Sequence, residues 1–123
     1  MHDKVNIPAA IAGLAEFWSQ ETVAEANGQL FKVAKGIGST RWHQHDDQDE
    51  LFIVYGGQLT IQLEERNVEL GVGDIFVVPR GVRHCPRADQ ETSFLIVGLN
   101  ITSNAAGGKP DPLARAGTST TTA

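Results

Sequence analysis

Metal-binding side chains are concentrated in the segment RWHQHDDQDELF, residues 41–52. His43 and His45 are two residues apart, so on a β-strand both would point to the same face, about 6.5–7 Å apart along the chain. Imidazole nitrogens bind first-row metals at about 2.0–2.1 Å, so one ion between the rings would be within reach of both. Histidines at this spacing also occur as ordinary surface or core residues. The pair alone therefore leaves two interpretations open, a metal site or two strand histidines without a ligand.

Two further residues would complete such a site. Glu50 follows His45 by five residues, an offset that a continuous strand would place on the opposite face. The polar run DDQD between them indicates a solvated turn, after which Glu50 can begin a new strand with its own facing. His84 follows VVPRGVR, where an apolar strand ends in a Pro/Gly turn. Neighbouring strands of a barrel would bring it close to the other three.

These side chains need a scaffold, and the chain predicts one made of short strands. Apolar runs separated by turn residues indicate strands at 29–34, 40–45, 50–55, 58–64, 67–70, 75–78 and 94–99. Many short strands with regular turn signals are typical of an all-β sandwich or barrel. Before them, apolar residues at three- and four-residue steps predict a short helix over Pro8–Trp18.

Composition limits the class of protein. The chain has 123 residues, which suits one domain. Its formal net charge of −5 argues against a nucleic-acid partner, because binding phosphates needs clustered Lys and Arg. It has no apolar run of membrane-spanning length and no secretion leader, so no membrane partner is expected. The single cysteine, Cys85, is interpreted as a buried thiol and fits a cytoplasmic location.

Two strands are apolar on both faces. LFIVY and FLIVGL show no alternation, although one small barrel has only one interior. Phe52 and Val54 share the parity of Glu50 and are expected to line that interior. Leu51, Ile53 and Tyr55 would then face outward, and the economical cover for them is a second subunit; the alternative is an intramolecular cover by the N-terminal helix with Trp18. We therefore expect a homodimer.

The spacing of the metal-capable residues resembles that of the cupin superfamily. Its first motif is matched by Gly38, His43, His45, Glu50 and Gly57, and its second by Gly73, Pro79-Arg80-Gly81 and His84. Two positions depart from the motifs: only four residues separate Gly38 from His43, and Ala88 replaces an asparagine that does not bind metal. The likeness extends over about residues 16–100 and is greatest to small single-domain bacterial monocupins, often labelled mannose-6-phosphate isomerase-like.

This resemblance implies a double-stranded β-helix, the cupin jelly-roll barrel, with a short N-terminal helix. Residues 1–26 would form a helical or extended arm, 27–102 the barrel and 103–123 a flexible tail. The implied ligands are His43, His45, Glu50 and His84, which would hold one divalent transition metal per chain: Mn, Fe, Ni, Cu or Zn. Two coordination positions would stay open for a small molecule.

The function implied is metal-centred. The chain is expected to be a metal-dependent isomerase, dioxygenase or decarboxylase/lyase acting on a small oxygen-rich molecule, with Glu50 as the candidate catalytic base. A non-catalytic ligand-binding or sensing module, or a barrel that the metal only stabilises, are the alternatives. Arg80 and Arg87 are candidates for holding an anionic substrate, since a guanidinium binds carboxylate and phosphate groups in a bidentate way. The alternative is that both are solvated at the barrel mouth.

Overall fold

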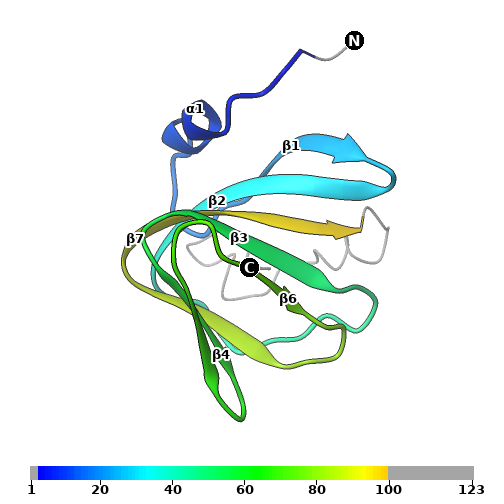
Figure 1. The fold of residues 1–123 in the computed structure, drawn as a ribbon, viewed down its shortest axis with the longest axis vertical. Helices are drawn as coiled ribbons and strands as arrows, with labels where there is room; N and C mark the ends of the chain where they lie inside the picture. The colour runs from blue at the N-terminus through cyan, green and yellow to red at the C-terminus, as the bar shows by residue number, and fades with distance from the viewer. Residues whose placement is uncertain (1–2, 100–123) are drawn as a thin grey trace.

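Seven strands and one short helix make up residues 3–99, the part of the chain that the computed structural model describes (Figure 1). The elements are α1 (Ile7–Ala12), β1 (Glu21–Ala26), β2 (Gln29–Ser39), β3 (Glu50–Gly56), β4 (Leu59–Leu63), β5 (Asn67–Leu70), β6 (Ile75–Val78) and β7 (His84–Leu99). All strand pairs are antiparallel, and five strands form the path β1-β2-β7-β3-β6. The predicted all-β jelly-roll barrel is confirmed.

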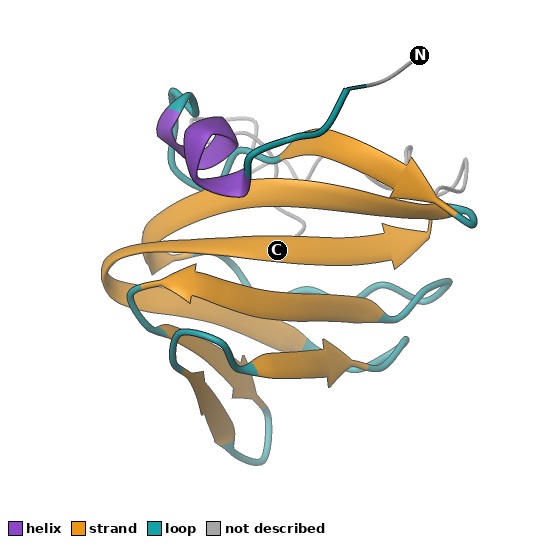
Figure 2. Ribbon diagram, turned by 45° about the horizontal axis from the view of Figure 1, so that its top comes forward, coloured by secondary structure: helices purple, strands orange, loops and turns teal. Residues whose placement is uncertain are grey.

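The long strand β7 connects the two halves of the barrel. Its second half pairs with β2 and β3, while its first half pairs with β4, which also pairs with β5. Figure 2 shows this strand bending around one end of the stacked strands. Because of this bend, the residues that open β7 lie close to those that open β3. The barrel thereby brings together positions that are far apart in the sequence.

Alternation along β3 separates the interior from the exterior. Phe52 and Val54 are fully buried, whereas Tyr55 is 43% exposed. Phe52 and Val54 belong to the main core together with apolar residues of the other strands and the loop before β1: Trp18, Ala34, Leu59, Ile61, Leu70, Val78, Ala88, Phe94 and Ile96. The predicted interior face of this strand is confirmed.

The N-terminal segment differs from its prediction. The helix ends at Ala12, because Gly13 follows it as the C-cap, and it does not continue to Trp18. Trp18 instead enters the barrel core, where its ring packs on Phe94 and over Gly36. Three apolar residues, Ile7, Ile11 and Leu14, pack outside the barrel on a second cluster formed by Val33, Leu95 and Ile53.

Two strand predictions were wrong and one strand was missed. Residues 40–45 form no strand, although His43 makes one isolated bridge to His84. The strand expected at 94–99 begins ten residues earlier, because the polar run from His84 to Ser93 pairs with β4 and β2. Strand β1 lies within the predicted arm and forms the edge of the sheet. Its mostly exposed sequence, ETVAEA, has no apolar run that would reveal it.

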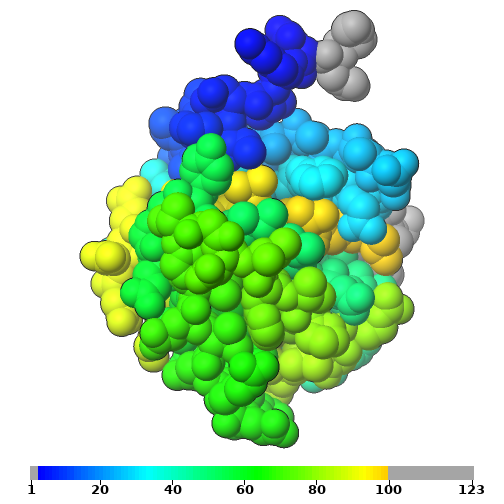
Figure 3. Space-filling view, viewed as in Figure 1, coloured from blue at the N-terminus to red at the C-terminus, as the bar shows by residue number. Residues whose placement is uncertain are grey.

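Figure 3 shows the N-terminal segment projecting from the rounded body of the barrel. Among residues 3–99, no helix is long and apolar enough to cross a membrane. The tail predicted at 103–123, and the last three residues of the predicted barrel, lie outside the described residues.

Candidate metal centre

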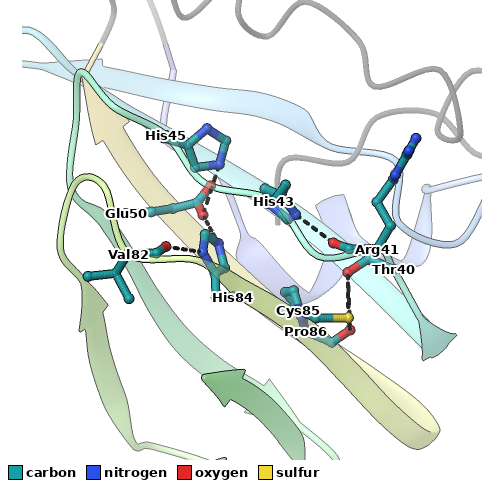
Figure 4. A network of polar contacts seen from close by, with 9 residues as sticks. All are labelled: Thr40, Arg41, His43, His45, Glu50, Val82, His84, Cys85 and Pro86. Carbon is teal, nitrogen blue, oxygen red and sulfur yellow. Dashed lines mark hydrogen bonds and ion pairs between the residues drawn. The ribbon is translucent and has the colours of Figure 1, made fainter. Parts of the chain in front are cut away.

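Three segments bring the four predicted ligands together at one end of the barrel (Figure 4). Glu50 is the first residue of β3 and His84 the first residue of β7, while His43 and His45 lie in the loop between β2 and β3. Each side chain offers one ligand atom, and these atoms all lie within 4.8 Å of one another. The predicted set of side chains therefore does converge.

The carboxylate of Glu50 lies at the middle of the cluster. Its Oε1 atom is 3.2 Å from Nε2 of His84 and 3.4 Å from Nε2 of His45. The ring centroids of His43 and His84 are 4.4 Å apart, and those of His43 and His45 are 5.1 Å apart. The site is thus narrow enough for one ion to contact all four side chains.

A backbone bridge, and not a continuous strand, fixes His43. Its N–H donates to the carbonyl of His84 at 2.9 Å, and the N–H of His84 donates back at 2.8 Å. The pairing register with β7 shifts by one residue between Ser39 and His43, so the chain bulges before the bridge. His45 is held separately, since its carbonyl accepts from the N–H of Gly81 at 2.7 Å. The two histidines converge through loop geometry, which strand alternation did not predict.

Two backbone carbonyls set the orientation of the imidazole rings. Nδ1 of His43 lies 2.7 Å from the carbonyl oxygen of Arg41, and Nδ1 of His84 lies 2.9 Å from that of Val82. A carbonyl only accepts, so both Nδ1 atoms must carry the hydrogen. Each neutral ring then presents the lone pair of Nε2 to the cluster. This is the arrangement found around metal-bound histidines.

That arrangement fits a bound cation. Nε2 of His43 is buried and has no hydrogen-bond partner within the described part of the chain. Nε2 of a neutral His84 faces the Glu50 oxygen, which is also an acceptor. A metal ion among these atoms would satisfy every lone pair, whereas otherwise a ring must be protonated. The donor set of three imidazoles and one carboxylate suits a transition metal.

Electrostatics keep the ligands in the forms that bind metal. In the metal-free site, burial would raise the pKa of Glu50, but the facing His45 and His84 rings, with a hydrogen on Nε2, lower it to about 2. Burial, and next the neighbouring His84, lower the pKa of His43 below its usual 6.5. The carboxylate is therefore ionised and the His43 imidazole neutral at neutral pH. Metal ligation requires these forms.

The loop carrying the histidines is anchored by a residue that sequence reasoning missed. Gln48 is buried, and its side-chain oxygen accepts from the N–H of Leu99 at 2.8 Å. A Cβ on Gly98 would lie only 2.5 Å from that oxygen, so a residue without a side chain is needed there. Gln48 lies inside a run interpreted as a solvated turn, and nothing in its spacing distinguishes it from the aspartates around it.

The arginines proposed for substrate binding are paired with surface carboxylates. Arg80 lies in the turn before β7, 58% exposed, with its Nε 3.5 Å from Asp49. Nε of Arg87 lies 3.4 Å from Asp89. A substrate role for Arg80 and Arg87 stays a prediction. Cys85 is buried beside Thr40, and burial raises the pKa of its thiol.

The fold and the side-chain cluster define a β-barrel with a site compatible with metal binding, and comparison with known proteins gives its family. The family model described as the cupin domain matches residues 29–98, more than half of the chain. The chain therefore belongs to the cupin family.

Individual relatives support this assignment. The chain is 31% identical over 93 residues to the uncharacterized protein YdbB of Bacillus subtilis, covering 75% of this chain and 82% of that protein. It is 36% identical to a cupin-2 domain containing protein from Shewanella frigidimarina, with a TM-score of 0.74, covering 76% and 91% of the two chains. Protein NMB1881 from Neisseria meningitidis shares the fold at 24% identity and a TM-score of 0.73, covering 80% and 100%.

Proposed function

We propose that this cupin is a metal-dependent enzyme that acts on a small oxygen-rich molecule. The observation that supports it is the uneven burial of the four candidate ligands. Glu50 and His84 are buried, whereas His43 and His45 remain partly exposed. A metal site closed on one side and open on the other can admit a substrate. Such an open position separates catalytic from structural metal sites.

The four candidate ligands would hold one divalent ion of Mn, Fe, Ni, Cu or Zn. When bound, the metal supplies Lewis acidity toward a substrate oxygen or activates water or dioxygen. The apolar core beneath the site excludes water from its inner side, since Phe52 is fully buried with its ring centroid 6.4 Å from that of His84. Glu50 is the side chain placed to accept a proton, and we propose it as the catalytic base.

The test begins with elemental analysis of protein purified without added metal. The metal-loaded protein is then mixed with sugar phosphates, hydroxy acids and oxo acids, and turnover is followed by NMR. We expect the wild-type protein to turn over at least one of these classes of compound. The Glu50→Gln variant, after it has been reloaded with metal, should lose this turnover. His2→Ala, which changes the one histidine outside both motifs, is the matched control and should keep its activity.

Two outcomes would contradict the proposal. Binding of these compounds without turnover would identify a ligand-binding or sensing module. Failure of the metal-loaded protein to bind any of them would assign the metal a purely structural role, as in a barrel closed by its own core.

A further inference from the structure

A lysine that sequence reasoning did not single out lies on the interior face of the barrel. In β2, Lys32 pairs with Ile96 of β7, and Ile96 pairs in turn with Phe52 of β3. Side chains directly opposite one another across paired strands share a face. Ile96 and Phe52 are both core residues, 1% and 0% exposed. Lys32 therefore points to the same side as the core and is half-buried.

The same register brings this lysine close to the metal centre. Leu51 pairs with Val97, so Glu50 lies opposite Gly98. On the interior face of the sheet, this pair is next to the row formed by Lys32, Ile96 and Phe52. The electrostatic field of Glu50 reaches the ammonium: burial lowers the pKa of Lys32, and the negative charge of Glu50 partly offsets this. Lys32 and Glu50 thus share one end of the barrel interior.

Among residues 3–99, no carboxylate lies within ion-pair distance of the Lys32 ammonium. Glu50 makes its close contacts with two histidines instead. A half-buried cation without a partner loses part of its hydration, and an incoming anion would offset that cost. The exposed Arg80 is different, because Asp49 already neutralises it.

Charge balance also favours an anion. A divalent ion, the Glu50 carboxylate and the Lys32 ammonium together carry a net charge of +2, since the imidazoles are neutral. A metal-coordinating group and a carboxylate from one small molecule would offset this charge. A single ammonium acts as a compact point charge and suits a singly charged group.

We propose that Lys32 is a specificity-determining residue whose ammonium binds a carboxylate on the small molecule that reaches the metal centre. The inference rests on the proposed function, because it requires a ligand at this site. It adds the substrate class, a carboxylate-bearing molecule whose other end carries metal-coordinating oxygens. Lys32 touches the ligand and not the metal, so its removal should leave metal binding intact.

Two probes separate the role of Lys32 from that of the metal. Acetohydroxamate has a metal-chelating group and no carboxylate, whereas succinic acid monohydroxamate has the same chelating group and a carboxylate. Affinities of both for the Zn²⁺-loaded protein are measured by calorimetry. We expect wild type to bind the carboxylate-bearing probe about tenfold more tightly, the size of one charge-assisted hydrogen bond less its desolvation.

The variants are Lys32→Met and a matched control, Lys35→Met, on the same strand. The Lys35 ammonium lies 5.3 Å from the ring centroid of Phe17, outside the barrel. Lys32→Met should lose the tenfold preference while binding acetohydroxamate and Zn²⁺ as tightly as wild type. Lys35→Met should keep the preference. If Lys32→Met does not fold, Lys32→Gln removes the charge while keeping a polar side chain.

Each contrary result has one meaning. Three results would overturn the role of Lys32. Wild type could bind both probes with equal affinity, or the Lys32 variants could keep the preference for the carboxylate-bearing probe. Lys35→Met could also lose that preference to the same extent as Lys32→Met. A lower Zn²⁺ content in Lys32→Met would also overturn this role, because the lysine would then support Glu50. Failure of Zn²⁺-loaded wild type to bind either probe would instead contradict the proposed function, since no position at the metal would be open.

Discussion

At the scale of the residue, two backbone carbonyls decide what the site can bind. The carbonyls of Arg41 and Val82 hold the hydrogen on Nδ1 of His43 and His84, so both rings present a lone pair. The Glu50 carboxylate lies against them, buried and ionised. A cluster of acceptors so far from solvent is unfavourable without a positive charge between them. The arrangement of these side chains is therefore compatible with a bound cation.

Removing one candidate ligand tests this directly. His45→Ala should lower metal affinity by more than the roughly 10–100-fold typical of losing a hydrogen-bond partner of a ligand. His45 is partly exposed, with 13% of its side chain accessible, so the barrel should still fold. Elemental analysis and competition with a chelator measure the effect.

The control for this experiment is His2→Ala, which should keep wild-type affinity. Wild-type protein that takes up no Mn, Fe, Ni, Cu or Zn at neutral pH would contradict the assignment of all four ligands.

Acid should release the metal, because ligation needs neutral imidazole and ionised carboxylate. The pKa of His43 is already below 6.5 in the folded protein, and bound metal would lower it further. We therefore expect the midpoint of metal loss to lie below pH 6.5. Dialysis at a series of pH values, with the metal content measured after each, checks this value. Metal retained unchanged down to about pH 3 would mean that the histidines are not ligands.

The metal-free protein should also lose stability in acid, in two steps. The folded pKa of His43 is lowered, so the unfolded chain binds the proton first and stability falls as pH drops below 6.5. The pKa of Glu50 is about 2 in the folded protein and 4.5 in the unfolded chain. The stability that its ionised carboxylate contributes is therefore lost as pH falls from 4.5 to 2. Urea unfolding at several pH values checks the sign. Stability that rises on acidification below pH 6.5 would contradict the His43 shift, and stability that rises from pH 4.5 to 2 would contradict the Glu50 shift.

At the scale of the element, Gly57 of the first cupin motif is needed for two reasons: its φ is positive, and there is no room for a Cβ. Gly57, between β3 and β4, has φ +83°, and a Cβ there would lie 2.5 Å from Oγ1 of Thr92. That hydroxyl is fixed because it donates to the carbonyl of Gln58 at 2.9 Å. The turn therefore cannot relax to accommodate a side chain.

Gly57→Ala should consequently cost more stability than the backbone conformation alone predicts. Gly28, in the turn between β1 and β2, is the matched control, since its φ is +77° and a Cβ there meets nothing within 4 Å. We expect about 1–2 kcal/mol of destabilisation for Gly28→Ala from the positive φ. Gly57→Ala should add roughly 1–3 kcal/mol for the steric conflict. Equal losses in urea unfolding would show that Thr92 moves aside.

The elements also show what sequence can and cannot predict here. Strands with a clear apolar pattern, such as LFIVY, were predicted correctly, because burial on the interior face requires that pattern. The first half of β7 was missed because it is polar and contains Pro86, yet its pairing with β4 is what brings His84 to the site. The convergence of the four candidate ligands was predicted from residue type and spacing. The bulge that orients His43 depends on contacts across the barrel, which spacing does not encode.

Residues with no motif were beyond sequence reasoning for the same reason. Lys32 lies in a largely apolar strand, where a lysine side chain is expected to face solvent, and only the register across β7 shows that it points inward. Gln48 likewise gains its role from Gly98, fifty residues later in the chain.

At the scale of the whole molecule, residues 3–99 cover only part of the outer face of the barrel. The apolar residues of the helical segment cover Val33, Leu95 and Ile53, so this segment explains part of what was attributed to a second subunit. Further along the sheet, β6 pairs with β3 and leaves an outer patch formed by Tyr55, Val72, Ile75 and Val77, each between 42% and 66% exposed. Contiguous apolar patches of this kind mark interaction sites.

We propose that the outer patch is the interface of a symmetric homodimer, because one patch on each subunit can cover the other across a two-fold axis. Ile75→Glu should dissociate the dimer, since the axis would bring like charges together in a protein that is already acidic. Ile37→Glu is the matched control: Ile37 is 44% exposed on β2, outside the patch, and its substitution should leave assembly unchanged. Sedimentation at micromolar concentration should give about twice the 13.2 kDa chain mass for wild type and the chain mass for Ile75→Glu. A wild-type mass near 13.2 kDa would contradict the dimer and leave the patch exposed to solvent on a monomer.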